Sequence, residues 1–290
     1  MITIFTPTYN RSYIIRTLYQ SLCDQSLLDF EWLIVDDGST DDTEEQIKNL
    51  IAENKITIRY FKQKNAGKHI AINYGVKEAK GELFFIVDSD DFLASNAIER
   101  LNFYYSQIKD DITFAGVSGN RTTFKGNRIG GNLSYEVIDC SPLDLRLKYH
   151  IKGDMAEAFK TQVLKEYPFP VFNNEKFCPE AMVWNRLSLK YRLRYFNEGI
   201  YRCEYLPDGL TAKIVRLRMQ SPLASMLYYS ELYHMPIPFL QKLKAAINFW
   251  RFSFCAKDSF SHKIKQIGLV SLFMYPLGLL FYLKDKKSKI

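Results

Sequence analysis

The sequence predicts an α/β fold in which a mixed, mostly parallel sheet is flanked by helices and followed by a helical C-terminal tail. Two observations predict the sheet: short apolar runs alternate with helical patterns along the first part of the chain, and polar clusters follow the apolar runs. The tail is predicted by a basic and apolar composition that the rest of the chain lacks.

The expected strands and helices follow one another as βαβ units. The strands are expected at residues 2–5, 32–35, 57–61 and 83–87, and the helices at residues 13–22, 43–52, 70–79 and 97–108. Ser12 and Ser95 are expected to cap the first and the last of these helices. Right-handed crossovers between parallel strands then give a Rossmann-like sandwich, with the sheet between two helical layers.

The strand expected at residues 83–87 runs directly into an acidic cluster. The strand is apolar on both alternating faces, as in a strand buried between two helical layers, and Asp88, Asp90 and Asp91 follow it. Carboxylates this close repel one another unless a cation or hydrogen-bond donors neutralise them. A divalent ion that also holds substrate phosphates is one such cation. The alternative is an acidic helix start capped by Asp90 or Asp91, and the sequence context has to decide between the two.

Polar clusters also lie at the ends of the other three expected strands. They read TPTYNR at residues 6–11, DDGST at residues 36–40 and NAGKHIAIN at residues 65–73. Because the carboxyl ends of parallel strands lie at one edge of a sheet, all four clusters are expected to line one crevice there. Their convergence predicts a nucleotide-binding crevice more strongly than any single cluster does.

Composition excludes several other classes of protein. The chain has 290 residues, of which 47% are hydrophobic and 15% aromatic, enough for a sizeable core. The five cysteines are scattered without CxxC spacing and the four histidines do not cluster, so neither a disulfide framework nor a zinc site is expected. No signal peptide is visible at the N-terminus, so the front of the chain is expected in the cytoplasm.

The net charge of +7 is distributed unevenly along the chain. Residues 213–290 hold 13 Lys and Arg residues and 3 acidic residues, whereas residues 1–212 hold 26 and 29. The front part shows no basic residues interleaved with stacking aromatics around a recognisable module, so nucleic acid is not an expected partner. An anionic membrane surface suits the basic tail better.

The four polar clusters, in this order and at these spacings, resemble a family 2 glycosyltransferase with the GT-A fold, of the kind found in bacterial cell-surface polysaccharide synthesis. The resemblance covers roughly residues 1–117. It implies that the nucleotide sugar is bound by Pro7, Thr8, Tyr9, Arg11, Asp36, Asp37, Lys68, Asp88 and Ser89. It also implies a Mn²⁺ or Mg²⁺ cofactor at the Asp-x-Asp motif, with Asp90 as the first expected ligand and Asp91 as the next.

The chemistry of these residues agrees with the resemblance. A carboxylate can accept the imide N–H of uracil, an aromatic ring such as Tyr9 can cover a base, and a metal ion held by Asp90 can bridge a diphosphate. Three alternatives stay open. Tyr9 could belong to the core, Asp36 could only support the turn at Gly38, and Lys68 could be a solvated lysine at a helix start.

The pattern changes after residue 117. Residues 119–133 are rich in glycine and polar residues, which predicts a surface excursion or a β-hairpin with a bend at Gly130 and Gly131. Residues 144–150 are amphipathic, and the strand and helix boundaries within residues 155–164 stay open.

A second candidate cluster is NEKFCPEAMVWNRL, at residues 174–187. A helix can start after Pro179, with Glu180 in its first turn. In the resembling family this helix begins with an acidic pair whose second member is the expected general base, and here Pro179 and Glu180 replace the pair. The spacing to the Trp-x-Arg that follows favours Glu180 as the base, with Glu175 as the substitute candidate. The alternative is that Glu180 only complements the helix dipole.

The resemblance implies an inverting transfer of a sugar from a nucleoside diphosphate sugar, with a UDP-sugar as the first expectation, to a hydroxyl group of a saccharide acceptor. A diphosphate leaving group needs a metal ion rather than a proton donor, and one carboxylate base suffices for the acceptor. One rival is a non-catalytic nucleotide-sugar-binding or membrane scaffold protein with the same fold. A second is a nucleotidyltransferase, which would usually show a Gly-rich, basic phosphate loop, and TPTYNR is not such a loop.

We expect a GT-A domain at residues 1–212 and a membrane-associating tail at residues 213–290. Within the domain, residues 1–117 are the nucleotide-sugar-binding half and residues 118–212 the acceptor-side half. The uncharged run at residues 267–283 is at the short limit for crossing a bilayer, and a proline and a glycine interrupt it. A straight span, a kinked or re-entrant segment, an in-plane helix and a packed core helix all stay open.

Lysines on both sides of the uncharged run favour a segment that enters and leaves on the same anionic face. We therefore expect the protein at the cytoplasmic face of the plasma (inner) membrane. An enzyme attached to this surface gains little if its acceptor is freely soluble, so the expected acceptor is a lipid-linked saccharide.

Overall fold

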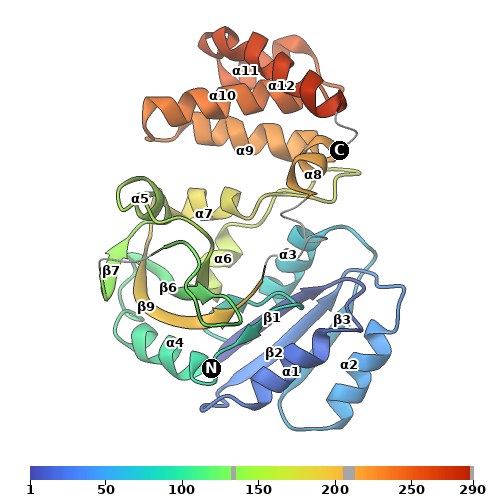
Figure 1. Cartoon of the computed structure of the whole chain (residues 1–290), viewed down its shortest axis with the longest axis vertical. Helices are drawn as coiled ribbons and strands as arrows, with labels where there is room; N and C mark the ends of the chain where they lie inside the picture. Colours follow the sequence, from blue (N-terminus) through green and yellow to red (C-terminus); the bar gives the residue numbers. More distant parts are fainter. Residues whose placement is uncertain (132–134, 205–212, 288–290) are drawn as a thin grey trace. The chain divides into compact units, whose positions relative to one another are not determined.

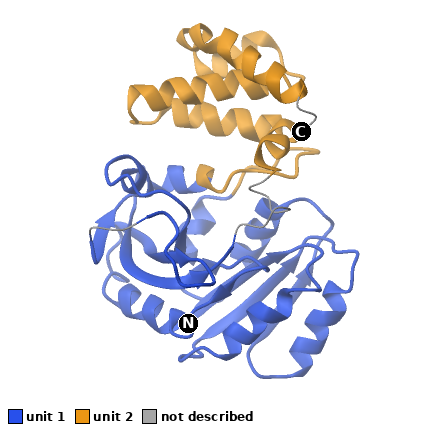
Figure 2. Ribbon diagram, in the orientation of Figure 1, with its two compact units in different colours: residues 1–168, 183–204 blue, residues 169–182, 205–290 orange. Residues whose placement is uncertain are grey.

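The structure is a computed structural model that describes residues 1–131, 135–204 and 213–287 (Figure 1). The chain forms two compact units, which Figure 2 colours separately. Unit 1 comprises residues 1–168 and 183–204, and unit 2 comprises residues 169–182 and 205–290. The boundary expected at residue 212 lies outside the described residues.

Unit 1 is built on a single mixed sheet. Its described strands are β1 (Ile2–Thr8), β2 (Phe30–Asp36), β3 (Ile58–Lys62), β4 (Leu83–Ile86), β5 (Phe92–Leu93), β6 (Phe114–Thr122), β7 (Val137–Cys140), β8 (Met155–Lys160) and β9 (Arg192–Arg202). The strand order is β3-β2-β1-β4-β8-β6-β9-β5, and β7 pairs with β9. The half from β3 to β4 is parallel, as expected, and β8 begins the antiparallel pairings of the second half.

Helices cover both faces of the parallel half (Figure 1). The helices with described residues in unit 1 are α1 (Ile15–Cys23), α2 (Thr43–Ala52), α3 (Lys68–Glu78), α4 (Ala97–Ser106), α5 (Pro142–Leu147), α6 (Thr161–Glu166) and part of α7 (Ala181–Leu187). The apolar faces of α1, α2 and α4 form one core with the strands, and α3 and α6 pack together with the sheet on the other side. The predicted α/β fold with flanking helices is confirmed.

The uninterrupted apolar runs of the strands follow from these two layers. Ile4 and Phe5 are neighbours in β1 and point to opposite faces of the sheet, yet both are fully buried. The same holds for Phe84 and Phe85 in β4. A strand that is covered on both faces needs apolar residues at every position rather than at alternate ones.

The two predicted serine caps are wrong. Helix α1 begins at Ile15, and the hydroxyl of Ser12 donates instead to Asp41 Oδ2 at 2.8 Å. Helix α4 begins at Ala97 after Asn96, without a side-chain cap, and Ser95 accepts a backbone hydrogen bond from Ser26 through its carbonyl. For Ser12 a tertiary hydrogen bond engages the hydroxyl, and for Ser95 the helix begins one residue too late for a serine cap, after Asn96.

The glycine-rich segment after residue 117 contains the expected hairpin, but it starts later. Residues 119–122 still belong to β6, and the chain turns where the Thr123 amide donates to the Asn127 carbonyl at 2.7 Å. Gly130 and Gly131 have φ values of 95° and 91°, which confirms the bend. Residues 132 and 133 lie outside the described residues. The open boundary within residues 155–164 is resolved as β8 followed directly by α6.

Unit 2 contains the predicted helical tail. Its described elements beyond residue 212 are α8 (Ile214–Gln220), α9 (Pro222–His234), α10 (Phe239–Ser253), α11 (Phe260–Ile267), the 3₁₀ helix η2 (Leu269–Met274) and α12 (Tyr275–Lys287). Its core is small and aromatic, with Phe249 and Trp250 of α10 fully buried against Met226 of α9 and Ile267 of α11. Among the described residues, no single helix is long and apolar enough to cross a bilayer, and one pair of helices that meets the criteria together is bent by 110°.

Candidate functional site

The register of the parallel strands brings three of the predicted clusters to one edge of the sheet. Thr8, the last residue of β1, pairs with Asp36, the last residue of β2. On the other side of β1, Phe5 pairs with Ile86 at the end of β4. The segments that follow these strands, which hold Tyr9, Asp37 and Asp88, therefore leave the sheet side by side.

Asp36 supports the turn at Gly38. Its carboxylate is fully buried and accepts the Ser39 amide at 2.7 Å on Oδ1 and the Tyr60 hydroxyl at 2.8 Å on Oδ2. Gly38 has a φ of +79°, and a Cβ there would lie 2.8 Å from the Asn65 amide nitrogen. The supporting role that the sequence left open for Asp36 is thus present, and the tight turn holds the next residue, Asp37, in place.

The Asp37 carboxylate holds the loop that precedes α3 by hydrogen bonds. Its Oδ1 accepts the Ala66 amide and its Oδ2 accepts the Gly67 amide, both at 2.8 Å. Gln63 donates a further hydrogen bond to Oδ1, and the Asp37 amide donates to the Thr8 carbonyl at 2.8 Å. This carboxylate therefore fixes where α3 begins.

The first residue of α3 is Lys68, and it faces the acidic cluster. Its ammonium lies 2.6 Å from Asp88 Oδ1. On the opposite side, Arg11 Nη2 lies 3.7 Å from Asp90 Oδ2. Two cations from two different strand-end clusters thus approach the two carboxylates of the Asp-x-Asp motif, and Lys68 is not an isolated solvated lysine.

Pro7 and Thr8 are buried at the end of β1, whereas Tyr9 is 46% exposed. The alternative that Tyr9 belongs to the core is therefore wrong. Asn10 holds the neighbouring backbone, since its Oδ1 accepts the Thr40 amide at 2.8 Å. The Tyr9 ring is left available to cover a planar ligand.

The acidic cluster forms a tight turn in which the three carboxylates have different surroundings. The Asp91 amide donates to the Asp88 carbonyl at 3.1 Å. Burial raises the pKa of Asp88, but the cations Lys68, Arg121 and Arg11 outweigh it and lower that pKa below its ordinary value. Burial and the charge of Asp88 raise the pKa of Asp90.

Asp91 is only 8% exposed, whereas Asp88 and Asp90 are half-buried. The Tyr201 hydroxyl donates to Asp91 Oδ2 at 2.7 Å and accepts the Asp88 amide at 3.0 Å. Burial and the charge of Asp88 raise the pKa of Asp91 to about 7, against the effect of this hydrogen bond. Asp91 therefore holds the turn from within the fold. Ser89, which lies in the same turn, is also buried.

Tyr201 and Arg121 are site residues that sequence reasoning missed. Tyr201 is fully buried in β9, more than 100 positions after the acidic cluster. Arg121 lies in β6, with its guanidinium 4.2 Å from the centre of the Tyr201 ring and 4.0 Å from Asp91 Oδ2. Neither residue belongs to a motif, so no local signal could have indicated them.

The acidic turn suits a divalent cation that is shared with a ligand. Within the described residues, no group of three or more His, Cys, Asp and Glu side chains has an arrangement that could hold a metal by itself. Mg²⁺ is commonly held by one or two carboxylates together with substrate phosphates, and Asp88 and Asp90 supply that donor set. Burial and, after it, the charge of Asp88 raise the pKa of Asp90, and a bound cation would relieve the repulsion between the two carboxylates.

His69 directly follows Lys68 in α3. It is buried at 3% exposure, burial lowers its pKa, and its Nδ1 has no hydrogen-bond partner among the described residues.

The two acids of the second cluster, Glu175 and Glu180, belong to unit 2. Glu180 directly precedes α7, which begins one residue later than expected, at Ala181. Glu175 has a structural role instead. Its Oε1 accepts the Leu223 amide at 2.7 Å and its Oε2 accepts the Ala224 amide at 2.9 Å, so it satisfies the first turn of α9. Glu175, the substitute candidate for the base, is thus engaged by the first turn of α9.

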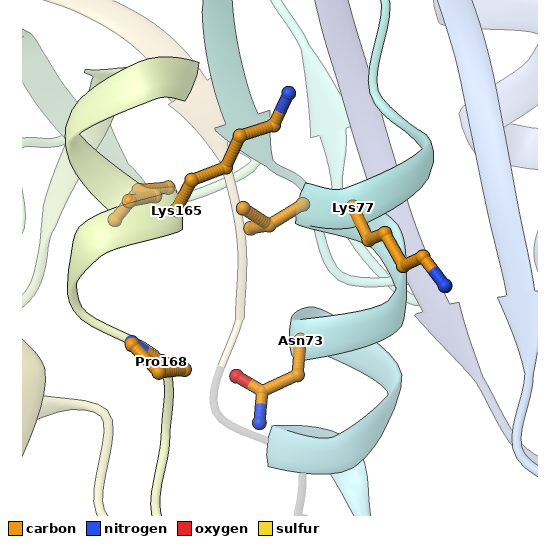
Figure 3. Close-up of a pocket in the computed structure, with 6 residues that line it drawn as sticks. Asn73, Lys77, Lys165 and Pro168 are labelled. Carbon is orange, nitrogen blue, oxygen red and sulfur yellow. The ribbon is translucent and has the colours of Figure 1, made fainter.

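A separate hollow of about 390 Å³ lies between α3 and α6 (Figure 3). It is lined by Asn73, Val76, Lys77, Leu164, Lys165 and Pro168. Figure 3 shows Asn73 of α3 directed towards Pro168 on the far side. None of the predicted site residues lines this hollow, so it is distinct from the crevice at the strand ends.

The sequence model of the family "Glycosyl transferase family 2" matches residues 3–160. An uncharacterised glycosyltransferase of Haemophilus influenzae is 36% identical over 126 residues, which are 42% of this chain and 50% of that protein. A Campylobacter jejuni protein named GalNAc(5)-diNAcBac-PP-undecaprenol beta-1,3-glucosyltransferase is 28% identical over 218 residues, which are 72% of this chain and 67% of that protein. The match thus spans about half the length of the first relative and two thirds of the second.

Solved structures with the GT-A glycosyltransferase fold share the architecture. TarS 1–349 of S. aureus in complex with UDP has a TM-score of 0.66 and 18% identity, and the match covers 98% of this chain and 87% of TarS 1–349. The mannosyltransferase PcManGT of Pyrobaculum calidifontis, in complex with GDP-Man and Mn²⁺, has a TM-score of 0.59 and 16% identity, with coverages of 98% and 87%. At these identities the likeness shows the fold.

Replacing Tyr201 by Phe removes the hydroxyl that joins the Asp88 amide to Asp91 Oδ2. We expect Tyr201→Phe to lower the free energy of unfolding by about 1–2 kcal/mol, because two buried polar groups lose their partner. Urea unfolding measures this. Tyr195→Phe is the matched control, since Tyr195 is equally buried in β9 and its hydroxyl has no hydrogen-bond partner among the described residues. Equal losses in the two variants would show that the Tyr201 hydroxyl does not stabilise the turn.

Proposed function

The chain belongs to glycosyl transferase family 2, and from that membership we propose that it is an enzyme that transfers a sugar from a nucleoside diphosphate sugar to a hydroxyl group of a saccharide acceptor. The observation that supports the proposal most is a pair of contacts at the strand ends. Lys68 contacts Asp88, and Arg11 contacts Asp90. This arrangement offers both cations and carboxylates to one small region, as a diphosphate with its counter-ion requires.

The donor we propose is a UDP-sugar. The solved TarS structures, which hold UDP or UDP-GlcNAc, support this choice through the shared fold. In the proposed complex the exposed ring of Tyr9 covers the base. Pro7, Thr8 and the turn around Asp36 and Asp37 form the wall beside it.

The cofactor we propose is Mn²⁺ or Mg²⁺, held by Asp90 and Asp88 together with the donor diphosphate. When bound, it would supply positive charge to offset the charge that develops on the leaving diphosphate. The sequence favoured Asp91 as the second ligand; we propose Asp88 in its place, because Asp91 is buried and accepts the Tyr201 hydroxyl. The Mn²⁺ complex of PcManGT supports metal use in this fold.

The residues of this chain have separate tasks in the proposed reaction. Lys68 and Arg11 bind and orient the diphosphate, because their cationic groups already lie against the Asp-x-Asp carboxylates. Glu180 takes the proton of the acceptor hydroxyl as the reacting oxygen attacks the anomeric carbon. A single base and a direct displacement invert the configuration at that carbon.

The acceptor we propose is a lipid-linked saccharide used in the assembly of a surface polysaccharide or glycoconjugate. The printed name of the Campylobacter relative, whose acceptor carries PP-undecaprenol, supports a lipid-linked substrate. The basic tail supports a membrane partner, since residues 213–290 carry 13 basic and 3 acidic residues. The proposed location is the cytoplasmic face of the plasma (inner) membrane.

Asp90→Asn tests the metal site because it removes a charge and keeps the shape of the side chain. We expect turnover of a UDP-sugar at saturating donor and Mn²⁺ to fall about a hundredfold or more, while thermal unfolding stays unchanged. The readout is UDP release, with hydrolysis counted as turnover when no acceptor is present. Asp110→Asn is the control, since Asp110 is an exposed acid after α4. Wild-type turnover in Asp90→Asn would rule out this residue as the main metal ligand.

Glu180→Gln tests the base. We expect transfer to an acceptor to fall about a hundredfold or more, with little change in the affinity for UDP measured by calorimetry, because this residue acts on the acceptor.

Glu175→Gln is the matched comparison for the base. An amide there can accept only one of the two α9 amide hydrogen bonds, so we expect lower stability of unit 2 and near-normal transfer by the folded protein. A specific loss of transfer in Glu175→Gln, with Glu180→Gln still active, would move the base to Glu175.

A further inference from the structure

Unit 2 presents a row of exposed apolar side chains along η2 and α12. Phe273 is 81% exposed, Val270 71%, Leu269 68% and Leu280 62%, and Leu277 and Leu283 are exposed as well. Isolated exposed apolar residues are ordinary, but a contiguous group on one segment marks a surface that meets another apolar phase. We call this set the apolar row.

The side of the same segment that packs on α10 is only partly apolar. Leu272, Met274 and Tyr275 lie half-buried against the core of unit 2, but the most buried residues of the segment are small or polar. Trp250 Nε1 of α10 donates to the Ser271 carbonyl at 3.0 Å and to its hydroxyl at 3.1 Å. Arg251 of α10 forms a two-point ion pair with Asp285, at 2.5 Å and 2.8 Å. Between these two anchors, Gly278 lies so close to α10 that a Cβ would be 2.5 Å from Trp250 Cβ.

The outer side of η2 and α12 is unusually apolar. A surface helix of a water-soluble domain buries its apolar face and exposes its polar face. Here the buried positions are Ser271, Gly278 and Asp285, Tyr275 and Leu272 are half-buried, and the apolar row is exposed. Such an arrangement suits a segment whose outer side is not in water.

Lysines border the apolar row at both ends. Lys284, Lys286 and Lys287 are exposed in the last turn of α12, and Lys265 is exposed in α11. Within residues 259–287 the sequence has a single acidic residue, Asp285, and it is paired with Arg251. An anionic headgroup layer complements this charge, whereas a second copy of the same surface would bring lysines against lysines.

The anchors on α10 also determine how the segment can meet a bilayer. Ser271 and Asp285, near the two ends of the segment, are held by Trp250 and Arg251, which are adjacent in α10, and Gly278 packs on the same part of that helix (Figure 1). The chain bends by 110° between α11 and this segment, at Gly268 with a φ of 93°. The side of the segment that faces α10 is thus occupied by protein and only its outer side is available to lipid, as an in-plane position requires.

We propose that η2 and α12 lie in the plane of an anionic membrane surface, with the apolar row among the lipid acyl chains and the bordering lysines among the headgroups. The inference deepens the proposed function, on which it rests for the presence of a membrane-bound acceptor. It also distinguishes among the positions that the uncharged run left open, because the side that faces α10 is already occupied by protein.

Vesicle binding by the full chain tests the proposal. The probe is vesicles of equal parts phosphatidylcholine and phosphatidylglycerol, with vesicles of phosphatidylcholine alone as comparison. We expect sedimentation with the anionic vesicles and about tenfold or more weaker binding for the double variant Phe273→Asp, Leu280→Asp. The matched control is Ile112→Asp, Leu189→Asp, which alters two exposed apolar residues of unit 1 and should bind as the unaltered chain does. Thermal unfolding confirms that both double variants are folded.

Depth of insertion is measured with Phe273→Trp and brominated lipids. We expect added quenching, relative to the unaltered chain, from bromines near the headgroups and little from bromines at the bilayer centre. Of the three native tryptophans, Trp32 and Trp250 are fully buried and Trp184 is half-buried, so the unaltered chain supplies the background. Strong quenching at the centre would show a crossing segment and overturn the proposal. So would a full chain that stays in solution with anionic vesicles, or a dimer in the absence of lipid that Phe273→Asp dissociates.

Hydrolysis of a UDP-sugar without vesicles separates this inference from the proposed function. The Phe273→Asp, Leu280→Asp variant should keep the hydrolysis rate of the unaltered chain. Intact hydrolysis with no vesicle binding would overturn the membrane inference alone. Vesicle binding with no hydrolysis of any nucleoside diphosphate sugar would overturn the proposed function and leave the membrane surface supported.

Discussion

Electrostatic repulsion within the Asp88–Asp91 turn is the constraint on which the rest of the site depends. Three carboxylates at the end of one buried strand destabilise each other unless positive charge and hydrogen-bond donors surround them. Lys68 and Arg11 approach from the crevice side, and Tyr201 and Arg121 approach from within the fold. The turn is therefore held between two layers of compensating groups, and the crevice side is the part that a ligand can use.

The compensating groups come from different parts of the chain, and the other polar clusters hold the backbone that positions them. Asp36 and Asp37 use their oxygens to hold the Gly38 turn and the loop before α3, and this fixes Lys68 at the start of that helix. Carboxylates at the sheet edge thus divide into those that shape the crevice and those that face it. The division follows from burial, since a buried carboxylate needs its hydrogen-bond donors close by.

Buried polar groups of unit 2 also have hydrogen-bond partners, but the outer side of η2 and α12 is largely apolar. Asp285 and Ser271 are satisfied by Arg251 and Trp250, and several large apolar residues of η2 and α12 are exposed. In water such exposure is unfavourable, because the hydrophobic effect favours burial of these side chains. In the proposed complex a membrane surface covers them, which connects the tail to the acceptor proposed for the enzyme.

The sequence by itself determined the βαβ order, the strand-end clusters and the family, because hydrophobic periodicity and short motifs are local properties. Only the tertiary structure decided what each side chain contacts. Tyr201 reaches the acidic turn from more than 100 residues away, Glu175 accepts the amides of α9, and the hydroxyl of Ser12 donates to Asp41 instead of capping a helix. Likewise, the uncharged run near the C-terminus was recognisable from composition, but which of its side chains are exposed was not. Such contacts depend on how distant segments pack, and no spacing along the chain encodes them.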